Sequence, residues 1–407
     1  MLPASKESGT RETFTLLGVG IVAGLIHLIG VIQFGRGFEM VQIARNLADH
    51  GTFANPFDAG PTGFTAVNPP LYPLLLAICF KLVSNPIAVA YLAAIAGIAA
   101  NALTAALLPR VSWLLFADRF PGIVASIAFL AAMQLMPAWD TSFTIAGMIL
   151  LCVFSAETIT SGVDSADDGV LAGLAAGGLV LMNPSSLMVT LPWIAWLAMK
   201  RRAAAYPCAL MVALFLVVSM WVMRNDLTLG APVLRTNFGM TVYASNNDCA
   251  VASLRAAEDD GCYEAHHPNT SREEARLVRT LGEVGYDRKR TADTVNWMTS
   301  HPGRFRRLTL ERVWDFWFPS PVRGPSSAVV WLVTWLSVPG LILMTRRREP
   351  ATFFVFAVLI VYPLMYYIVV SDTRYRYPIL WISALAAGYF VSACRARLQA
   401  RWPALLR

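Results

Sequence analysis

The chain has 407 residues, of which 56% are hydrophobic and only 14% are charged. A soluble protein of this length carries charge on about a quarter of its residues, so the composition excludes an ordinary soluble domain. The net charge of +7 does not indicate nucleic-acid binding, because the basic residues cluster at the ends of hydrophobic stretches, at 200–202, 346–348 and 395–397.

Ten hydrophobic stretches are long enough, or nearly so, to cross a hydrocarbon layer of about 30 Å as helices. We predict spans at 14–34, 87–109, 121–138, 141–157, 170–185, 186–199, 205–223, 327–344, 352–370 and 377–394. If the first span leaves the cytoplasm, the three basic clusters all lie on the cytoplasmic side, as the positive-inside rule requires. The sequence therefore predicts an all-α multi-pass protein of the cell inner (plasma) membrane, with both termini in the cytoplasm.

Two polar segments divide the chain and are predicted to lie outside the cytoplasm. The first outer loop, 35–86, belongs to an N-terminal membrane bundle that covers 1–223. The extracytoplasmic segment, 224–325, precedes the C-terminal membrane helices and cytoplasmic tail at 326–407. We expect this segment to be mostly helical.

Three details of the extracytoplasmic segment indicate local structure. Ser271 and Glu274 have the spacing of a helix capping box. Residues 303–317 alternate arginines with aromatic side chains, which is typical of a helix at a membrane interface. Cys249 and Cys262 can form a disulfide if the segment is extracytoplasmic, and the sequence leaves this open.

The first outer loop opens with a two-faced helix at 37–51. Its polar residues recur at helical spacing along one face, and these are Glu39, Gln42, Asn46 and Asp49, with His50 at the end. Such a helix lies flat on the membrane and presents its polar row outward. A plain surface helix with solvated charges is the alternative.

A loop rich in glycine and proline follows at 51–73 and contains Asn68 and Tyr72. Because proline fixes φ and breaks helices, this is a shaped loop, either part of a site or a rigid connector. The apolar stretch 71–84 is short for a crossing, so we expect it to lie along the outer surface or to re-enter the membrane.

Further polar residues end membrane spans on the outer side, namely Asp140, Asn183, Arg224, Asn225, Arg374, Tyr375 and Arg376. A second acid on the side of Glu39 can serve as a base, a positioning group or a metal ligand. Outer arginines suit a lipid phosphate, because guanidinium groups bind phosphate through paired hydrogen bonds. Hydration of Asp140, snorkelling of the arginines and a simple helix break at Asn183 are the alternatives.

Seven stretches, in order along nearly the whole chain, resemble the glycosyltransferase C (GT-C) superfamily, close to its protein O-mannosyltransferase and aminoarabinose transferase (family 39-like) group. They are FEMVQIARNLADHGTF, GPTGFTAVNPPLYPLLLAICFKL, PAWDTS, GLAAGGLVLMNPSSL, WVMRNDLTLGAPVLRTNFGMTVYASNND, HPGRFRRLTLERVWDFW and RYRYPI. No single stretch is specific to this superfamily, but seven stretches in the same order are a fairly specific match. The resemblance implies an outward-facing cavity between the first outer loop and the extracytoplasmic segment.

The same resemblance implies a polyprenyl-phosphate sugar as donor, delivered from within the bilayer. Carried over to this chain, the catalytic acids are Glu39 and Asp140, and the residues that face the lipid phosphate are Arg224, Arg374 and Arg376. The pattern departs from better-known members in one place. Those members often carry an aspartate ahead of the IAR segment, where this chain has Arg36 and Gly37, and its nearest acid is Glu39.

We therefore predict a membrane glycosyltransferase that moves the sugar, with inversion, to a glycan, lipid or protein acceptor on the extracytoplasmic face. Residues expected to position the substrates are Gln42, Asn46, Asp49, His50, Asn68, Tyr72, Asn183, Asn225 and Tyr375. If the acceptor is itself a phosphate, no base is needed and Glu39 only orients it.

Cofactors and rival functions stay open at this point. The sequence has no nucleotide-binding motif, and two acids are too few to argue for a Mg²⁺ or Mn²⁺ site, which remains an option. The rivals are a flippase or transporter for lipid-linked sugars and a polymer ligase that uses a lipid-diphosphate glycan. The polar residues gather on one membrane side, which favours surface chemistry over transport but does not separate the two enzymes.

Overall fold

The structure, a computed structural model, describes residues 4–28, 39–83, 85–132, 140–160, 165–200, 205–320 and 325–401. Within these ranges the secondary structure is helical, apart from two isolated bridges that pair Ala54 with Phe64 and Ser253 with Ser371. The predicted all-α class is confirmed.

Helices occupy each of the ten ranges predicted to span the membrane. The N-terminal part contains α1 (Ala4–Leu28), α2 (Glu39–His50), α3 (Leu71–Leu82), α4 (Pro86–Phe116), α5 (Phe120–Ala132), α6 (Asp140–Thr160), α7 (Ala166–Met182), η2 (Pro184–Ser186), α8 (Leu187–Lys200) and α9 (Ala205–Leu229). The rest contains α10 (Phe238–Ser245), α11 (Leu254–Asp259), α12 (Cys262–His266), α13 (Arg272–Ser300), α14 (Pro302–Trp317), α15 (Pro325–Arg346), α16 (Thr352–Val361), η4 (Tyr362–Ile368), η5 (Thr373–Tyr375) and α17 (Tyr377–Arg401). Parts of the first and third predicted spans, 29–34 and 133–138, lie outside the described residues.

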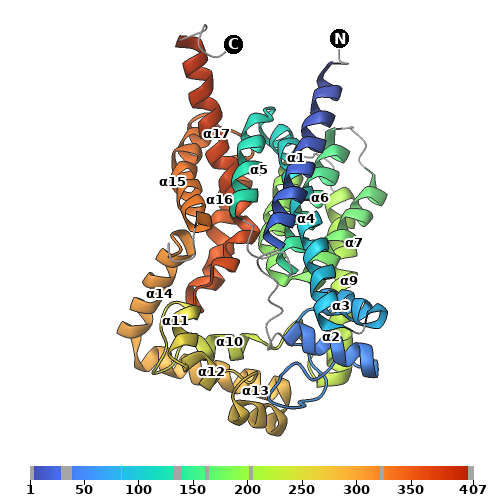
Figure 1. Cartoon of the computed structure of the whole chain (residues 1–407), viewed down its shortest axis with the longest axis vertical. Coiled ribbons are helices and arrows are strands. Elements are labelled where there is room, and N and C mark those ends of the chain that lie inside the picture. Colours follow the sequence, from blue (N-terminus) through green and yellow to red (C-terminus); the bar gives the residue numbers. More distant parts are fainter. Residues whose placement is uncertain are drawn as a thin grey trace.

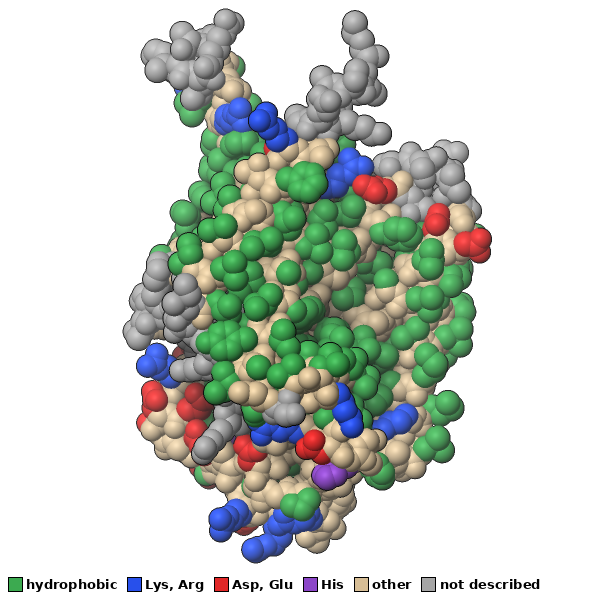
Figure 2. All heavy atoms as spheres, turned by 45° about the vertical axis from the view of Figure 1, so that its right-hand side comes forward, with side chains coloured by type: hydrophobic (Ala, Val, Ile, Leu, Met, Phe, Trp, Pro, Cys, Tyr) green, Lys and Arg blue, Asp and Glu red, His purple; other side chains and the backbone are tan. Residues whose placement is uncertain are grey.

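Five helices are long and apolar enough to cross a membrane: α4, α6, α9, α15 and α17. Shorter apolar helices lie at Leu71–Leu82, Phe120–Ala132, Pro184–Met199 and Thr352–Ile368. Figure 2 shows a broad hydrophobic band with charged side chains toward both ends of the molecule. The protein is therefore a multi-pass membrane protein, and the count of ten crossings stays a prediction.

Both termini lie at one end of the molecule, and α2, α3 and α10–α14 lie toward the other (Figure 1). The placement of both termini in the cytoplasm stays a prediction. The 12-residue helix α3 is only about 18 Å long, too short for a crossing, as expected for the stretch 71–84.

A stripe of glycines lets α7 and α9 approach closely. Gly169, Gly173 and Gly177 recur every four residues along one face of α7. A Cβ added at Gly169 would lie 2.6 Å from the carbonyl oxygen of Tyr206, and one at Gly173 would overlap the carbonyl oxygen of Leu210. Membrane helices often pack in this way, because small residues allow backbone contact where no hydrophobic driving force exists.

Helices α10 and α13 and the first outer loop are joined by hydrogen bonds and packing. The Ala66 carbonyl accepts a hydrogen bond from Thr236 N (3.1 Å), and Ala66 N donates to the Glu283 carboxylate of α13 (2.6 Å). Phe57 and Val67 pack against α10 and α13 in a small hydrophobic cluster. The first outer loop is thereby held against the segment that follows α9.

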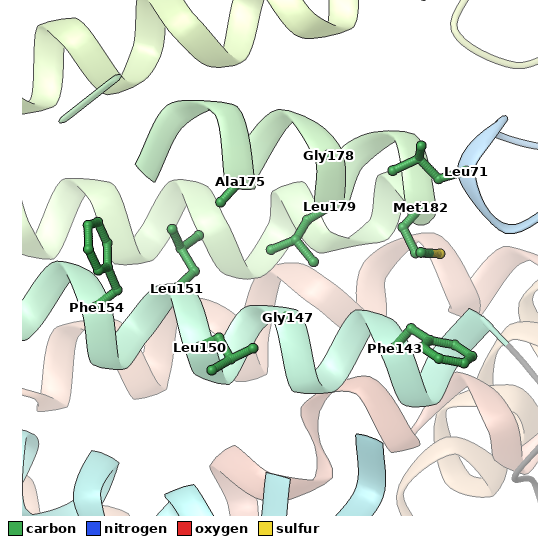
Figure 3. Close-up of a pocket in the computed structure, with 10 residues that line it drawn as sticks. All are labelled: Leu71, Phe143, Gly147, Leu150, Leu151, Phe154, Ala175, Gly178, Leu179 and Met182. Atoms are coloured by element: carbon green, nitrogen blue, oxygen red, sulfur yellow. The ribbon is translucent and has the colours of Figure 1, made fainter. Parts of the chain in front are cut away.

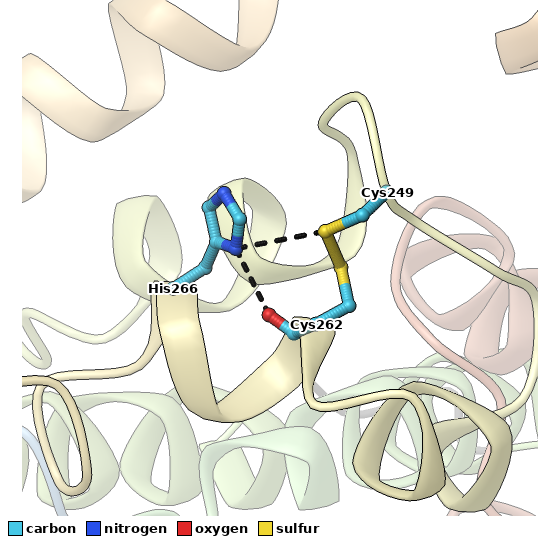
Figure 4. Close-up of side chains that lie close together, drawn as sticks. All are labelled: Cys249, Cys262 and His266. Carbon is cyan, nitrogen blue, oxygen red and sulfur yellow. Dashed lines mark hydrogen bonds between the residues drawn. A yellow bond between two sulfur atoms is a disulfide. The ribbon is translucent and has the colours of Figure 1, made fainter.

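The structure shows the predicted helix cap of the extracytoplasmic segment and the disulfide that the sequence left open. Ser271 precedes α13 as its N-cap, and its hydroxyl accepts a hydrogen bond from Glu274 N (3.4 Å). Cys249 and Cys262 form a disulfide, which encloses α11 and ends at the first residue of α12 (Figure 4).

Candidate functional site

Asp140 and Asn183, which lie 43 residues apart in the sequence, form the centre of a polar cluster. Asp140 is the first residue of α6, and Asn183 directly follows α7. Asn183 Nδ2 donates to Asp140 Oδ2 (2.9 Å), while its Oδ1 accepts hydrogen bonds from the backbone N and hydroxyl of Ser185. Because Oδ1 and Nδ2 of Asn183 are both hydrogen-bonded, the orientation of its amide group toward Asp140 is fixed.

Two arginines from other parts of the chain interact electrostatically with Asp140. The positive charges of Arg235 and Arg374 both stabilise a negative charge on Asp140. Arg235 also interacts electrostatically with Glu39. Arg235 is held in place by Nε, which donates to Val67 O (2.9 Å), and by Nη2, which contacts Asn68 Oδ1 (3.3 Å). Burial lowers the pKa of Arg235, and its electrostatic interactions with Asp140, Tyr366 and Glu39 oppose that shift.

Tyrosines line the cluster on the side of the C-terminal helices. Tyr375 stacks on Tyr366 with ring centroids 4.6 Å apart, and the Tyr366 hydroxyl lies 3.2 Å from that of Tyr362. Arg374 lies over the Tyr375 ring and places its Nε 3.6 Å from Asp372 Oδ2. A quarter of the Arg374 side chain is exposed.

Glu39 lies at the start of α2, where one of its carboxylate oxygens is 3.5 Å from His267 Nε2. Its side chain is one-fifth exposed, whereas that of His267 is buried. The structure thus brings Glu39, Asp140, Asn183, Arg374 and Tyr375 into one electrostatically connected region. Tyr72 joins it, because its side chain packs on Phe143 and interacts electrostatically with Asp140.

Arg224 and Asn225 have different surroundings. Arg224 donates to the carbonyl oxygens of Thr65 (2.8 Å) and Phe53 (3.0 Å), and its guanidinium lies over the Trp221 ring. Asn225 is buried and donates to Val233 O (2.8 Å). Both side chains therefore hold the first outer loop and the segment after α9.

The remaining predicted site residues lie in three places. Arg376 is buried against Trp317 and bonds Ser383, with Nε and Nη1 lacking hydrogen-bond partners. Gln42 bonds Asp58, and Asn46 bonds Thr52 and Asn55 within the first outer loop. Asp49 and His50 are exposed at the end of α2.

Four residues of this region were not predicted from the sequence: Arg235, His267, Tyr366 and Tyr263, whose ring stacks on that of His267. Arg235 and His267 come from the polar segment, where many arginines and two other histidines offer no distinguishing pattern. Tyr366 lies inside a predicted span and carried no signal apart from its aromatic character. No spacing rule links these residues to α2 or α6, because only the docking of the outer helices brings them together.

A metal site receives no support from the one described group of three possible ligands, Cys249, Cys262 and His266. The two sulfurs are joined in a disulfide, so they are not thiolate ligands, and His266 Nδ1 bonds the Cys262 carbonyl (2.9 Å; Figure 4). A divalent cation near Glu39 or Asp140 stays an untested option.

An apolar groove of about 300 Å³ lies between α6 and α7. Its lining residues are Leu71, Phe143, Gly147, Leu150, Leu151, Phe154, Ala175, Gly178, Leu179 and Met182. Phe143, Met182 and Leu71 lie at one end and Phe154 at the other (Figure 3). Since Phe143 is one turn from Asp140, and Met182 precedes Asn183, the first end adjoins the polar cluster.

No protein-family model and no curated protein matches this sequence. Solved structures do match. The archaeal oligosaccharyltransferase AglB from Archaeoglobus fulgidus, in complex with an inhibitory peptide and a dolichol-phosphate, aligns with a TM-score of 0.53 at 13% identity, over 97% of this chain and 52% of that one. An Archaeoglobus fulgidus oligosaccharyltransferase in the apo form gives 0.57 at 13% identity, over 96% and 51%.

ArnT from Cupriavidus metallidurans, bound to undecaprenyl phosphate, aligns over 97% of this chain and 80% of that one at 12% identity, with a TM-score of 0.42 that is too low to identify a fold. The chain thus spans about half the length of the matching oligosaccharyltransferases and has a GT-C-like fold. The finer assignment to the family 39-like group stays a prediction.

Proposed function

We propose that this protein is an integral-membrane glycosyltransferase that moves a sugar from a polyprenyl-phosphate donor to an acceptor on the extracytoplasmic face. One observation carries the proposal. A cluster of two acids and two arginines adjoins an apolar groove between membrane helices. A donor with a charged head and an isoprenoid tail has the complementary distribution of charge. The likeness to AglB, whose structure contains a dolichol-phosphate, supports this class of donor.

The donor would bind with its tail in the groove and its phosphate at Arg235 and Arg374. Both guanidinium groups interact electrostatically with Asp140, which places them beside one acid of the cluster. Arg224 already donates to two backbone carbonyls, so its role would be to hold the first outer loop. Arg376, predicted from the sequence as a phosphate ligand, would support η5 from its buried position.

The reaction would be a direct displacement at the anomeric carbon. An acceptor hydroxyl oxygen forms the new bond to this carbon, the bond between the carbon and the phosphate oxygen breaks, and the phosphate leaves with the electron pair. Glu39 would accept the hydroxyl proton, because its carboxylate is partly exposed and Asp140 is engaged by Asn183 and the arginines. A positioned base contributes about 10²- to 10⁴-fold to a rate, and stabilisation of the leaving charge by arginines is often the larger contribution.

The test is a reconstituted assay with a polyprenyl-phosphate sugar in proteoliposomes and a panel of acceptor hydroxyl compounds. Glu39→Gln should lower the rate by at least about 100-fold, because it removes the base and keeps the shape. Glu273→Gln, an exposed acid of α13, is the matched control and should retain the wild-type rate. An unchanged rate for Glu39→Gln would remove the base assignment.

The products of this assay separate the rival functions. Transfer with release of polyprenyl monophosphate supports the proposal, whereas release of a diphosphate indicates a polymer ligase. Movement of intact donor between leaflets without loss of sugar indicates a flippase. Arg235→Gln should raise the KM for the donor by roughly tenfold or more, since a hydrogen bond to a charged group contributes about 1.5–3 kcal/mol.

A further inference from the structure

His267 is a buried histidine that contacts Glu39 across two outer segments. Its side chain is 6% exposed, and its Nε2 lies 3.5 Å from Glu39 Oε1. This separation is longer than a strong hydrogen bond. Catalytic hydrogen bonds are often long in the free enzyme and shorten when substrate binds, so the distance suits a contact that tightens during turnover.

The surroundings of His267 determine which ring nitrogen carries the proton. Asn269 N donates to Nδ1 (3.2 Å), so Nδ1 is an acceptor and carries no hydrogen in the neutral ring. The single proton is therefore on Nε2, the nitrogen that faces Glu39. Burial lowers the pKa of His267, and although the carboxylates of Glu39, Glu264 and Glu274 oppose that shift, the ring stays neutral near pH 7.

Aromatic neighbours fix the plane of this ring. Tyr263 stacks on His267 with centroids 5.0 Å apart and an interplanar angle of 21°. Phe57, from the first outer loop, meets the ring edge-on at 6.4 Å. With one nitrogen bonded to backbone and both the face and edge covered, the ring has little freedom to rotate away from Glu39.

The disulfide fixes the short helix that carries this arrangement. Cys262 begins α12, and the bond to Cys249 ties that end of the helix to the segment after α10 (Figure 4). Tyr263 is the next residue, and His267 immediately follows the helix. A five-residue helix has little stability of its own, so the cross-link helps to keep Tyr263 and His267 in place.

From these contacts we infer that His267 is a positioning residue for Glu39: its Nε2–H holds one carboxylate oxygen, and the other oxygen is left to take the acceptor proton. The inference rests on the proposed function. His267 keeps its own proton throughout, and the acceptor proton ends on Glu39. Arg235 acts on the same carboxylate, and of the acids around His267, Glu274 is itself paired with Arg290 (2.9 Å).

The pH–rate profile distinguishes this role from simple packing. A hydrogen-bond donor to a carboxylate favours the charged form over the neutral form, and replacing His267 with a residue that cannot donate removes that preference. For His267→Phe we expect kcat to fall roughly 10- to 100-fold and the acid limb of the profile to move toward higher pH. His267→Gln, which keeps a side-chain N–H, should recover part of the rate and move the limb back.

The adjacent histidine provides the control. His266 bonds the Cys262 carbonyl and faces the disulfide, so His266→Phe should leave the acid limb where it is. All variants are compared for melting temperature in detergent, so that a poorly folded His267→Phe is recognised and the His267→Gln profile then decides.

Failure of the inference and failure of the proposed function give different results. If the wild type transfers no sugar from any polyprenyl-phosphate donor, the proposed function fails. If the wild type transfers sugar and Glu39→Gln does not, but both His267 variants keep the wild-type profile, His267 does not position Glu39. A loss of rate in both His267 variants without any change in pH profile also overturns the positioning role.

Discussion

Gly178 offers a direct test of the groove as the place where a donor tail binds. A Cβ built on this residue meets only Leu71 Cδ1, at 3.9 Å, so a larger side chain can enter the groove without touching backbone. Gly147 on the opposite wall is less suitable, because its Cβ would overlap the Leu179 side chain. Gly178→Leu should therefore fill part of the 300 Å³ groove and leave the helices in place.

The size of the effect follows from where the tail comes from. A tail that moves from the bilayer to the groove gains no hydrophobic free energy, since lipid chains are as apolar as the groove wall. When leucine occupies part of the groove, the tail loses dispersion contacts with the groove wall. Each pair of atoms contributes ~0.1–0.2 kcal/mol, and we put the total loss at about 1.5 kcal/mol. That loss corresponds to a roughly tenfold rise in the KM.

The assay measures the transfer rate against the mole fraction of donor in proteoliposomes. Gly178→Leu should raise the KM and leave kcat nearly unchanged, because the reacting groups lie beyond the end of the groove. Gly18→Leu in α1 is the matched control, since a Cβ at Gly18 meets no atom within 4 Å and Gly18 does not line the groove. A folded Gly178→Leu protein with the KM of wild type would show that the tail binds elsewhere.

Three further predictions concern the scaffold. Gly173→Val should lower the melting temperature, since overpacking costs about 1–3 kcal/mol and the Cβ would overlap the Leu210 carbonyl. Replacing Cys249 and Cys262 with serine should destabilise the outer segment by about 3 kcal/mol, measured as faster limited proteolysis near α11 and α12. Burial raises the pKa of Glu283 above its usual 4.5, so its contribution to stability is full below that pH and is lost as the pH rises through the raised pKa. The melting temperature of the wild type should therefore decline as the pH rises through this range, whereas that of Glu283→Gln should not; a parallel decline in both proteins would contradict this.

The membrane helices could be predicted from sequence because each is specified by its own composition. An apolar run of sufficient length folds as a helix whatever its neighbours are, so α4, α9 and α17 fall close to their predicted ranges. Asp140 and Asn183 were found for the same reason, since both mark helix ends. Their hydrogen bond, in contrast, depends on the packing of α6 beside α7, which no local pattern encodes.

Two arginines that end predicted spans have different surroundings in the structure. Arg224 and Arg374 both follow hydrophobic runs, yet Arg224 donates to loop carbonyls while Arg374 faces Asp140. The difference comes from what the tertiary fold places beside each guanidinium. Arg235, which has no span next to it in the sequence, reaches the cluster because Val67 and Asn68 fix its side chain.

The position of Glu39 therefore depends on contacts far from α2 in sequence. Arg235 and His267 both act on this carboxylate, and both belong to the outer segment. That segment is joined to the first outer loop through the buried Glu283, which accepts from Ala66 N and bonds Thr236. Because local opening of such a junction needs less free energy than global unfolding, a change at this junction should impair transfer before the membrane helices lose their fold.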